Sequence, residues 1–257
     1  MKLLRGSLAL VFCILFLLLG DPVQRLVVVP MIKLFPSRRT AIMGRWLHTM
    51  RWLSVSPITY IGGARFPRAP KIPGDGDVLV IMNHQSIFDI PLVIKAFPVT
   101  TFIRFIARTR YFKWIPTVSH LLRLYQYPSV NPRANASEIK KGLIEIRDTA
   151  RKADVPLCIF PEGTRTKDGE IGPFRRTGLQ LILKQRPWKV YVLVGDGYWK
   201  VAKMKQWVRG MDDLRGKLEL AGVFDWTDPK QNSEAFIGEL RQAMIHRLAE
   251  MRQEVPA

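Results

Sequence analysis

Residues 78–89 read Val-Leu-Val-Ile-Met-Asn-His-Gln-Ser-Ile-Phe-Asp, an apolar run that turns polar at its end. The turn-forming residues Pro-Gly-Asp-Gly at 73–76 precede the run, which predicts a buried strand. Ser86 and Asp89 are three residues apart and form a capping-box pattern, so a helix is expected to begin near Ser86. His84 then lies in the turn between the strand and the helix.

This placement decides what His84 can do. On a regular α-helix, residues five apart differ by about 140° in azimuth, so His84 and Asp89 would not share a face. From the turn, the imidazole can reach the carboxylate. The spacing alone also allows a simpler interpretation, in which Asp89 caps the helix and His84 is a satisfied histidine.

Strand and helix patterns alternate along the rest of the chain. Apolar runs like the first occur at 100–107, 156–160, 190–194 and 217–224. Helical periodicity covers 135–152, with Ile139, Leu143 and Ile146 on one face, and 232–254. This alternation predicts the α/β class, with a mixed sheet flanked by helices.

A second polar segment, Phe160-Pro161-Glu162-Gly163-Thr164-Arg165, follows the run at 156–160. Glycine lets a backbone come close to a ligand, and an arginine fork matches phosphate oxygens with two hydrogen bonds. Because α/β sheets bind ligands at the carboxyl ends of their strands, both polar segments are expected at one edge. Taken alone, the segment also fits a solvated turn with a surface glutamate and arginine.

The 257-residue chain carries 40 Lys and Arg against 21 Asp and Glu, a net charge of +19. Residues 22–74 hold nine basic residues and no acid, and residues 90–137 hold seven and no acid. Such a field is expected to face an anionic partner: a lipid surface, a phosphorylated substrate or nucleic acid. Cys13 and Cys158 lie in apolar runs and offer neither a disulfide framework nor metal-ligand spacing, so no metal site is expected.

The N-terminal residues 1–36 predict membrane attachment. A charge-free run covers 7–20 and a second apolar run covers 26–35. Each is shorter than the roughly 20 residues that cross a bilayer. We favour two short helices that break near Gly20–Pro22 and dip into one leaflet, over a single tilted span from about residue 3 to 29 or a signal sequence.

Three segments are therefore expected along the chain. Residues 1–36 form the apolar membrane anchor, and residues 37–73 form a basic segment that lies on anionic headgroups. Residues 74–257 form the α/β domain, in which both polar segments lie.

In these two polar segments, the sequence resembles the glycerophospholipid acyltransferases typified by 1-acyl-sn-glycerol-3-phosphate acyltransferase. The signatures of that family are an Asn-His-x4-Asp box and a later Phe-Pro-Glu-Gly-Thr-Arg box. Both stand intact here, with His84 and Glu162 78 residues apart, and the resemblance covers about residues 74–220. Three departures weaken the match at the acceptor: Ser119-His120 stands where glycine is usual, Asn131-Pro132-Arg133 replaces the usual Asp-Arg, and Val190-Tyr191-Val192 lacks the usual proline.

The resemblance implies acyl transfer from a thioester, either acyl-coenzyme A or acyl carrier protein, to the free hydroxyl of a lysophospholipid. The first choice of acceptor is 1-acyl-glycerol-3-phosphate, which would give phosphatidic acid. His84 is then the catalytic base and Asp89 its partner, with no cofactor beyond the thioester. The implied substrate-binding residues are Glu162, Gly163, Thr164, Arg165 and Arg133.

The resemblance also implies where the protein works. Its partners are an anionic phospholipid membrane, the lysophospholipid and the thioester donor, and not nucleic acid. The expected location is the inner or cytoplasmic membrane, with the catalytic domain on the cytoplasmic face.

Three alternatives stay open. The departures at Arg133 and Tyr191 leave room for a different lysolipid acceptor. The net charge also fits a non-catalytic basic protein that binds membranes or nucleic acid, although the two boxes would then be unexplained. A thioester hydrolase would use a similar base with water, which needs no head-group site of the kind expected at Arg165.

Overall fold

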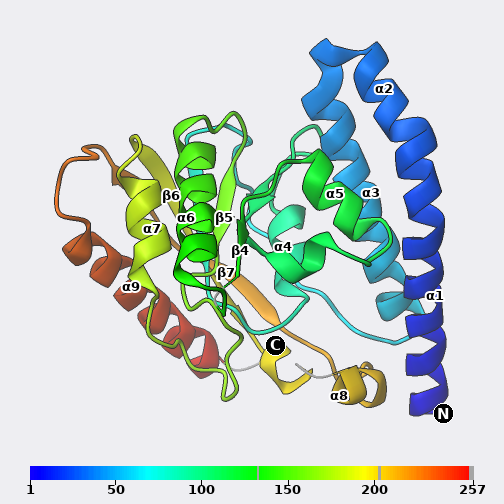
Figure 1. The fold of residues 1–257 in the computed structure, drawn as a ribbon. Helices are drawn as coiled ribbons and strands as arrows, with labels where there is room; N and C mark the ends of the chain where they lie inside the picture. The colour runs from blue at the N-terminus through cyan, green and yellow to red at the C-terminus, as the bar shows by residue number, and fades with distance from the viewer. Residues whose placement is uncertain (132, 202–203, 255–257) are drawn as a thin grey trace.

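The computed structural model describes residues 1–131, 133–201 and 204–254. Within them, a five-stranded sheet carries helices on both faces, and two long N-terminal helices pack beside it (Figure 1). The sheet consists of β1 Val78–Met82, β2 Arg104–Phe105, β5 Leu157–Ile159, β6 Trp188–Asp196 and β7 Lys217–Trp226. A small ladder joins β3 Ala107–Arg108 to β4 Ser129–Val130. The predicted α/β class is confirmed.

The strand order is β2-β5-β1-β6-β7. The first four strands are parallel and β7 is antiparallel to β6, so the sheet is mixed as predicted. Because β5, β1 and β6 are neighbours and run the same way, the loops that follow them meet at one edge of the sheet. The expected strand at 100–107 is much shorter, since only 104–105 pairs with β5.

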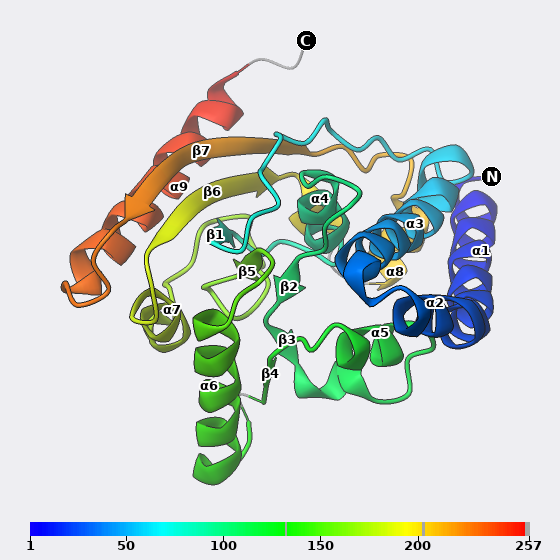
Figure 2. The ribbon, with the colours of Figure 1, turned by 90° about the horizontal axis from the view of Figure 1, so that it is seen from above.

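The central strand β1 is buried on both faces, which explains its unbroken apolar run. Val78, Val80 and Met82 pack in the core that includes α3 and α4, and Leu79 and Ile81 pack in the core beneath α6, α7 and α9 (Figure 2). The helices that follow β1 are α4 Asp89–Lys95, α5 Val118–Leu124, α6 Ala136–Arg151, α7 Arg176–Leu183, α8 Met204–Arg209 and α9 Ser233–Gln253.

Helix α4 begins at Asp89, so its predicted start near Ser86 is wrong. The Ser86 hydroxyl accepts a hydrogen bond from the Phe88 N–H at 3.0 Å, while the Asp89 carboxylate bonds back to the N–H groups of Gln85 and Ser86. Both side chains therefore shape a loop ahead of the helix. As predicted, His84 lies in that loop.

Helix α6 begins as predicted, because the Asn135 side chain caps it by accepting from the Glu138 N–H at 2.9 Å. Of the residues predicted to share one face, Ile146 is buried and Ile139 is exposed. The buried face of α6 runs through Gly142, Ile146 and Ala150, and the first turn projects beyond the sheet (Figure 2).

The N-terminal helix is continuous, so the expected break near Gly20–Pro22 is wrong. Helix α1 Lys2–Val23 passes through a π-helical turn, Gln24–Val28, into α2 Val29–Leu34. A short 3-10 turn at Pro36–Arg38 then leads into α3 Arg39–Tyr60, which returns alongside α1. The basic segment 37–73 thus contains a full helix.

Contacts with the α/β domain hold the helix on the N-terminal side of Pro22. A proline inside a helix removes one N–H and displaces the carbonyl four residues earlier, which a π turn and outside donors can accommodate. Here the Thr117 hydroxyl donates to the Leu17 carbonyl at 2.6 Å, and the Thr117 N–H donates to Asp21 at 2.9 Å. Gly20 is a packing residue, because a Cβ there would lie 2.7 Å from the Thr117 hydroxyl oxygen.

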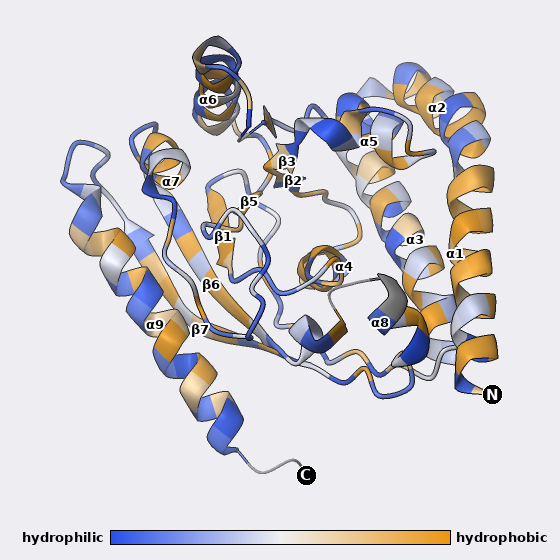
Figure 3. Ribbon diagram, turned by 60° about the horizontal axis from the view of Figure 1, so that its bottom comes forward, coloured by the Kyte–Doolittle hydropathy of each residue, from blue (hydrophilic) through white to orange (hydrophobic). Residues whose placement is uncertain are grey.

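Apolar side chains face outward along this helix. Among the described residues, the helix Lys2–Leu34 is the one long and apolar enough to cross a membrane. Sixteen of the twenty-five exposed large hydrophobic side chains in the described part lie in its neighbourhood, at residues 1–35. Figure 3 shows the hydrophobic colour along most of α1.

Candidate active site

The loop after β1 brings His84 and Asp89 together, as the sequence predicts. The His84 Nδ1 lies 2.7 Å from the Asp89 Oδ2, and Asp89 is fully buried while the His84 side chain is 17% exposed. The same carboxylate oxygen accepts from the Gln85 and Ser86 N–H groups at 2.7 and 2.8 Å. With Nδ1 donating to the carboxylate, Nε2 carries the lone pair and can accept a proton.

The second box and the residue that follows it contact His84. The Phe160 ring stacks on the His84 ring with centroids 4.4 Å apart. The Thr166 N–H donates to the His84 carbonyl at 2.8 Å. Because β5 neighbours β1, the two boxes meet although they are far apart in the sequence.

Glu162 also holds this loop instead of facing open space. It is buried, its Oε1 accepts from the His84 N–H at 2.9 Å, and its Oε2 accepts from the Gly172 N–H at 3.2 Å. Burial raises the pKa of Glu162, against the opposing effect of these two N–H donors. The structure therefore places Glu162 as a support of the His84 backbone, whereas the sequence suggested contact with the acceptor.

The backbone conformation and the packing at position 163 both require a glycine. Its φ is +66°, and a Cβ there would lie 2.7 Å from the Arg175 side chain. The Gly163 carbonyl accepts from Arg108 Nη2 at 2.9 Å. Two arginines thus flank this glycine, one from β3 and one from the residue before α7.

Thr164 and Arg165 are the parts of the second box turned toward solvent. Thr164 is exposed and Arg165 is partly exposed. Across the ranges 1–131, 133–201 and 204–254, neither side chain has a hydrogen-bond partner. Both side chains are therefore free to contact a ligand, and the next residue, Thr166, bonds through its N–H to the His84 carbonyl.

Arg133 is not joined to either box by a contact between described residues. It is exposed, and its N–H donates to the Asn131 side chain at 3.2 Å. Pro132, the middle residue of that segment, lies outside the described residues. Arg108, which sequence analysis did not single out, takes the place beside the second box; its only sequence signal is its position in the acid-free stretch 90–137.

Cys158 and Ser86, two side chains that could in principle act as covalent nucleophiles, are both buried. Cys158 lies in β5 and is fully buried, and burial raises the pKa of its thiol well above the ordinary value. The hydroxyl of Ser86, also buried, accepts from the Phe88 N–H. In the described part of the chain, no group of three or more His, Cys, Asp and Glu side chains could hold a metal ion.

A carboxylate-bound histidine at the carboxyl edge of a mixed sheet defines a class of α/β proteins equipped for acid–base chemistry. Comparison with known proteins gives the family. The acyltransferase family model matches residues 61–193, which is over half of the chain. The chain belongs to the acyltransferase family, and the resemblance seen in its two boxes is confirmed.

Individual relatives agree. A 1-acyl-sn-glycerol-3-phosphate acyltransferase of Cocos nucifera is 32% identical over 145 residues, which cover 56% of this chain and 42% of the relative. A probable 1-acyl-sn-glycerol-3-phosphate acyltransferase of Mycoplasma pneumoniae is 32% identical over 110 residues, covering 40% of this chain and 39% of the relative. The match thus spans about two fifths of the length of these relatives.

A solved structure shares the fold. The crystal structure of the 1-acyl-sn-glycerophosphate (LPA) acyltransferase PlsC from Thermotoga maritima superposes with a TM-score of 0.69 at 17% identity. The superposition covers 100% of this chain and 98% of that one. The N-terminal helices are therefore part of the shared fold.

Proposed function

We propose that the protein transfers a fatty acyl group from a thioester to the free hydroxyl of a lysophospholipid, with 1-acyl-glycerol-3-phosphate as the first acceptor. The observation that carries this proposal is the His84–Asp89 pair at 2.7 Å in a member of the acyltransferase family, with the second box tied to it by the Thr166 N–H bond to the His84 carbonyl. The names of the relatives support the acceptor.

The chemistry needs one base and no acyl-enzyme. His84 Nε2 takes the proton of the acceptor hydroxyl while the oxygen attacks the thioester carbonyl, forming the new C–O bond. The C–S bond then breaks, and the departing sulfur takes the proton back from the imidazolium. Asp89 fixes the tautomer and stabilises the imidazolium, and a base of this kind contributes on the order of 10²–10⁴ in rate.

The second box supplies the features of a phosphate site. Arg165 offers a partly exposed guanidinium fork, and Thr164 offers an exposed hydroxyl. Arg108 and Arg175 add positive charge around the Gly163 turn. Arg133 is a further candidate for contact with the acceptor phosphate. Water as the acyl acceptor would leave this cationic surface without a role.

The helix α1 supports attachment to one leaflet of a membrane. Lys2 pairs with Asp212 and Asp213, and Asp21 accepts from the Thr117 N–H, so both ends of α1 contact the same α/β domain. These ends are about 30 Å apart at 1.5 Å per residue. A spanning helix would separate them across the bilayer, whereas a helix lying in one leaflet keeps both contacts and buries its outward apolar face.

The surroundings of the site suit the cytoplasmic side. The acid-free segment 22–74 carries nine basic residues, which favours an anionic leaflet. Coenzyme A and acyl carrier protein thioesters are the candidate donors. We place the catalytic domain on the cytoplasmic face of the membrane, with no role for nucleic acid.

The test is a product assay with purified full-length protein. Labelled acyl-coenzyme A or acyl carrier protein is offered with vesicles that contain one lysolipid at a time, and the product is identified by mass. We expect phosphatidic acid from 1-acyl-glycerol-3-phosphate. Transfer only to lysolipids without a terminal phosphate monoester would overturn the acceptor assignment, and release of free fatty acid alone would show a hydrolase.

A further inference from the structure

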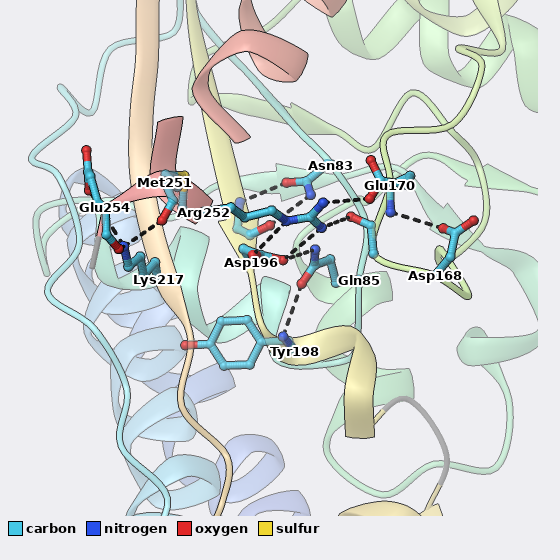
Figure 4. Close-up of polar contacts among 12 residues, drawn as sticks. Asn83, Gln85, Asp168, Glu170, Asp196, Tyr198, Lys217, Met251, Arg252 and Glu254 are labelled. Atoms are coloured by element: carbon cyan, nitrogen blue, oxygen red, sulfur yellow. Dashed lines mark hydrogen bonds and ion pairs between the residues drawn. The ribbon is translucent and has the colours of Figure 1, made fainter. Parts of the chain in front are cut away.

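We propose that Arg252, near the end of α9, is a positioning residue that holds the His84 loop in its reactive geometry. The inference rests on the function proposed above. Arg252 and its partner Asp196 lie outside residues 61–193, the part that the family model matches, so membership of the family assigns them no role. Figure 4 shows the polar contacts of Arg252, Asp196 and Gln85.

The residues on either side of His84 are tied to the end of β6. Gln85 is fully buried; its Nε2 donates to Asp196 Oδ1 at 3.3 Å and its Oε1 accepts from the Tyr198 N–H at 3.1 Å. The Asn83 amide exchanges two hydrogen bonds, of 2.9 and 2.8 Å, with the Gly195 backbone. The position of the imidazole therefore depends on where the end of β6 lies.

Arg252 joins the end of β6 to the loop after the second box. Its Nε donates to Asp196 Oδ2 at 3.1 Å, its Nη1 pairs with Glu170 at 2.5 Å, and its Nη2 donates to the Gly169 carbonyl at 3.0 Å. In Figure 4 the guanidinium lies between Asp196 and Glu170, with Gln85 beside Asp196. One side chain from α9 thus connects two loops of the site.

The contacts close into a ring that returns to His84. The Gly169 N–H donates to the Thr166 hydroxyl at 3.1 Å, and the Thr166 N–H donates to the His84 carbonyl at 2.8 Å. The ring therefore runs from His84 through Thr166, Gly169, Arg252 and Asp196 to Gln85. Loss of the guanidinium opens it on both sides, at Asp196 and at Gly169.

Both members of the central ion pair are charged at neutral pH. Burial alone would raise the pKa of Asp196, but the hydrogen bonds from Arg252 and Gln85 outweigh it and lower the pKa. The Asp196 hydrogen bond raises the pKa of Arg252. The two side chains are 19% and 34% exposed, so the pair is only partly screened by water.

The first measurement separates positioning from stability. A displacement of about 1 Å at a catalytic group can cost about 100-fold in rate. We expect Arg252→Gln to lower kcat by about 10–100-fold with little change in the KM of the acceptor, because Arg252 contacts Asp196, Glu170 and Gly169 and, among the described residues, neither Thr164 nor Arg165. Arg252→Lys keeps the charge beside Asp196 and should recover part of kcat, but it cannot make all three contacts.

The matched control is Arg247→Gln on the same helix. Arg247 pairs with Glu219, Glu250 and Glu254 and contacts neither box among the described residues. Its loss removes ion pairs from α9 without opening the ring. The proposal predicts a kcat close to wild type for Arg247→Gln even where its Tm falls as far as that of Arg252→Gln. Parallel losses of Tm and kcat in both variants would overturn it.

A second readout does not depend on activity. The chain has four histidines, so nitrogen-15 histidine spectra can resolve the His84 ring, assigned by its absence in His84→Gln. In wild type and Arg247→Gln we expect the Nδ1–H tautomer, and in Arg252→Gln a mixture of tautomers or exchange broadening. An unchanged His84 spectrum in Arg252→Gln contradicts the proposal. If wild-type protein transfers no acyl group, the proposed function fails, and these spectra still decide whether Arg252 positions His84.

Discussion

The carboxyl edge of the sheet buries a charged side chain, whereas the N-terminal helix α1 exposes apolar side chains. At the sheet edge, the Asp89 carboxylate is fully buried and receives three hydrogen-bond donors. Along α1, large apolar side chains such as Leu4 and Leu19 are more than half exposed. Burying a charge and exposing apolar surface each cost free energy in water, so each is retained for a purpose. The contrast supports the two proposed surroundings of the chain, a closed polar site at the sheet edge and a lipid surface along α1.

Buried polar contacts join the π-helical turn after α1 to helices α5 and α3. Gln24 in the π-helical turn is fully buried; it donates to His120 Nδ1 and accepts from the Trp46 indole at 2.7 Å. His120 belongs to α5 and Trp46 to α3. The apolar N-terminal helix is thereby fixed to α5, which belongs to the domain that carries His84.

The largest effect is expected at the carboxylate of the sheet edge. Asp89→Asn leaves an amide oxygen to accept the same three donors, and its NH₂ takes the place of Oδ1, which has no partner in the described part of the chain. Only the charge is lost, so we expect acyl transfer to fall by about 10²–10⁴ with the fold retained. Steady-state rates and circular dichroism check this. Near-normal transfer would show that the pair does not act as a base.

The next largest effect is expected at Arg165, and it distinguishes the proposed head-group site from the catalytic base. Arg165→Ala should raise the KM for 1-acyl-glycerol-3-phosphate by about 10–100-fold, since a hydrogen bond to a charged group contributes about 1.5–3 kcal/mol. Arg176→Ala is the control, because Arg176 pairs with Glu234 on the surface. Equal KM values in both variants would remove Arg165 from the acceptor site.

A smaller effect sharpens the assignment of α1 to lipid. Leu15 is 43% exposed on α1, and Leu15→Asp should weaken sedimentation with anionic vesicles by about tenfold through lost apolar burial. Ile139→Asp makes the same kind of change at a side chain that is 40% exposed on α6, and vesicle binding should stay at the wild-type level. If both variants bind equally well, the outward face of α1 does not contact the bilayer.

The smallest effect concerns pH and the Asp196–Arg252 pair. Because the pKa of Asp196 is lowered in the folded state, its contribution to stability is present above the ordinary value of 3.8 and is lost as the pH falls through the folded value. The difference in unfolding free energy between wild type and Asp196→Asn should shrink as the pH falls below 3.8. Denaturant titrations across this range test it. A difference that does not vary with pH would exclude ionisation of Asp196 as the cause.

The sequence predicts those features that depend on neighbouring residues. The apolar run of β1 is continuous because both faces of the strand are covered. The His84–Asp89 contact is predicted because the two residues are five apart and His84 lies in the turn before the helix. The pairing of the two boxes follows from the rule that parallel strands share a carboxyl edge. These are the parts of the fold and site that the structure confirms.

The sequence does not predict features that depend on contacts between residues far apart in the chain. Pro22 suggests a helix break, but Thr117 supplies donors from across the fold and the helix continues. Glu162 suggests a ligand contact, yet its oxygens accept from two distant backbone N–H groups. Arg252 lies 56 residues from Asp196, and no local pattern indicates that they pair.

The central claim is that the His84 imidazole activates the acceptor hydroxyl, and the most direct measurement is acyl transfer by purified His84→Ala in vesicles, with labelled thioester and 1-acyl-glycerol-3-phosphate. The account predicts no phosphatidic acid above the uncatalysed background, with vesicle binding and circular dichroism equal to those of wild type. Phosphatidic acid formed at the wild-type rate by His84→Ala would contradict it.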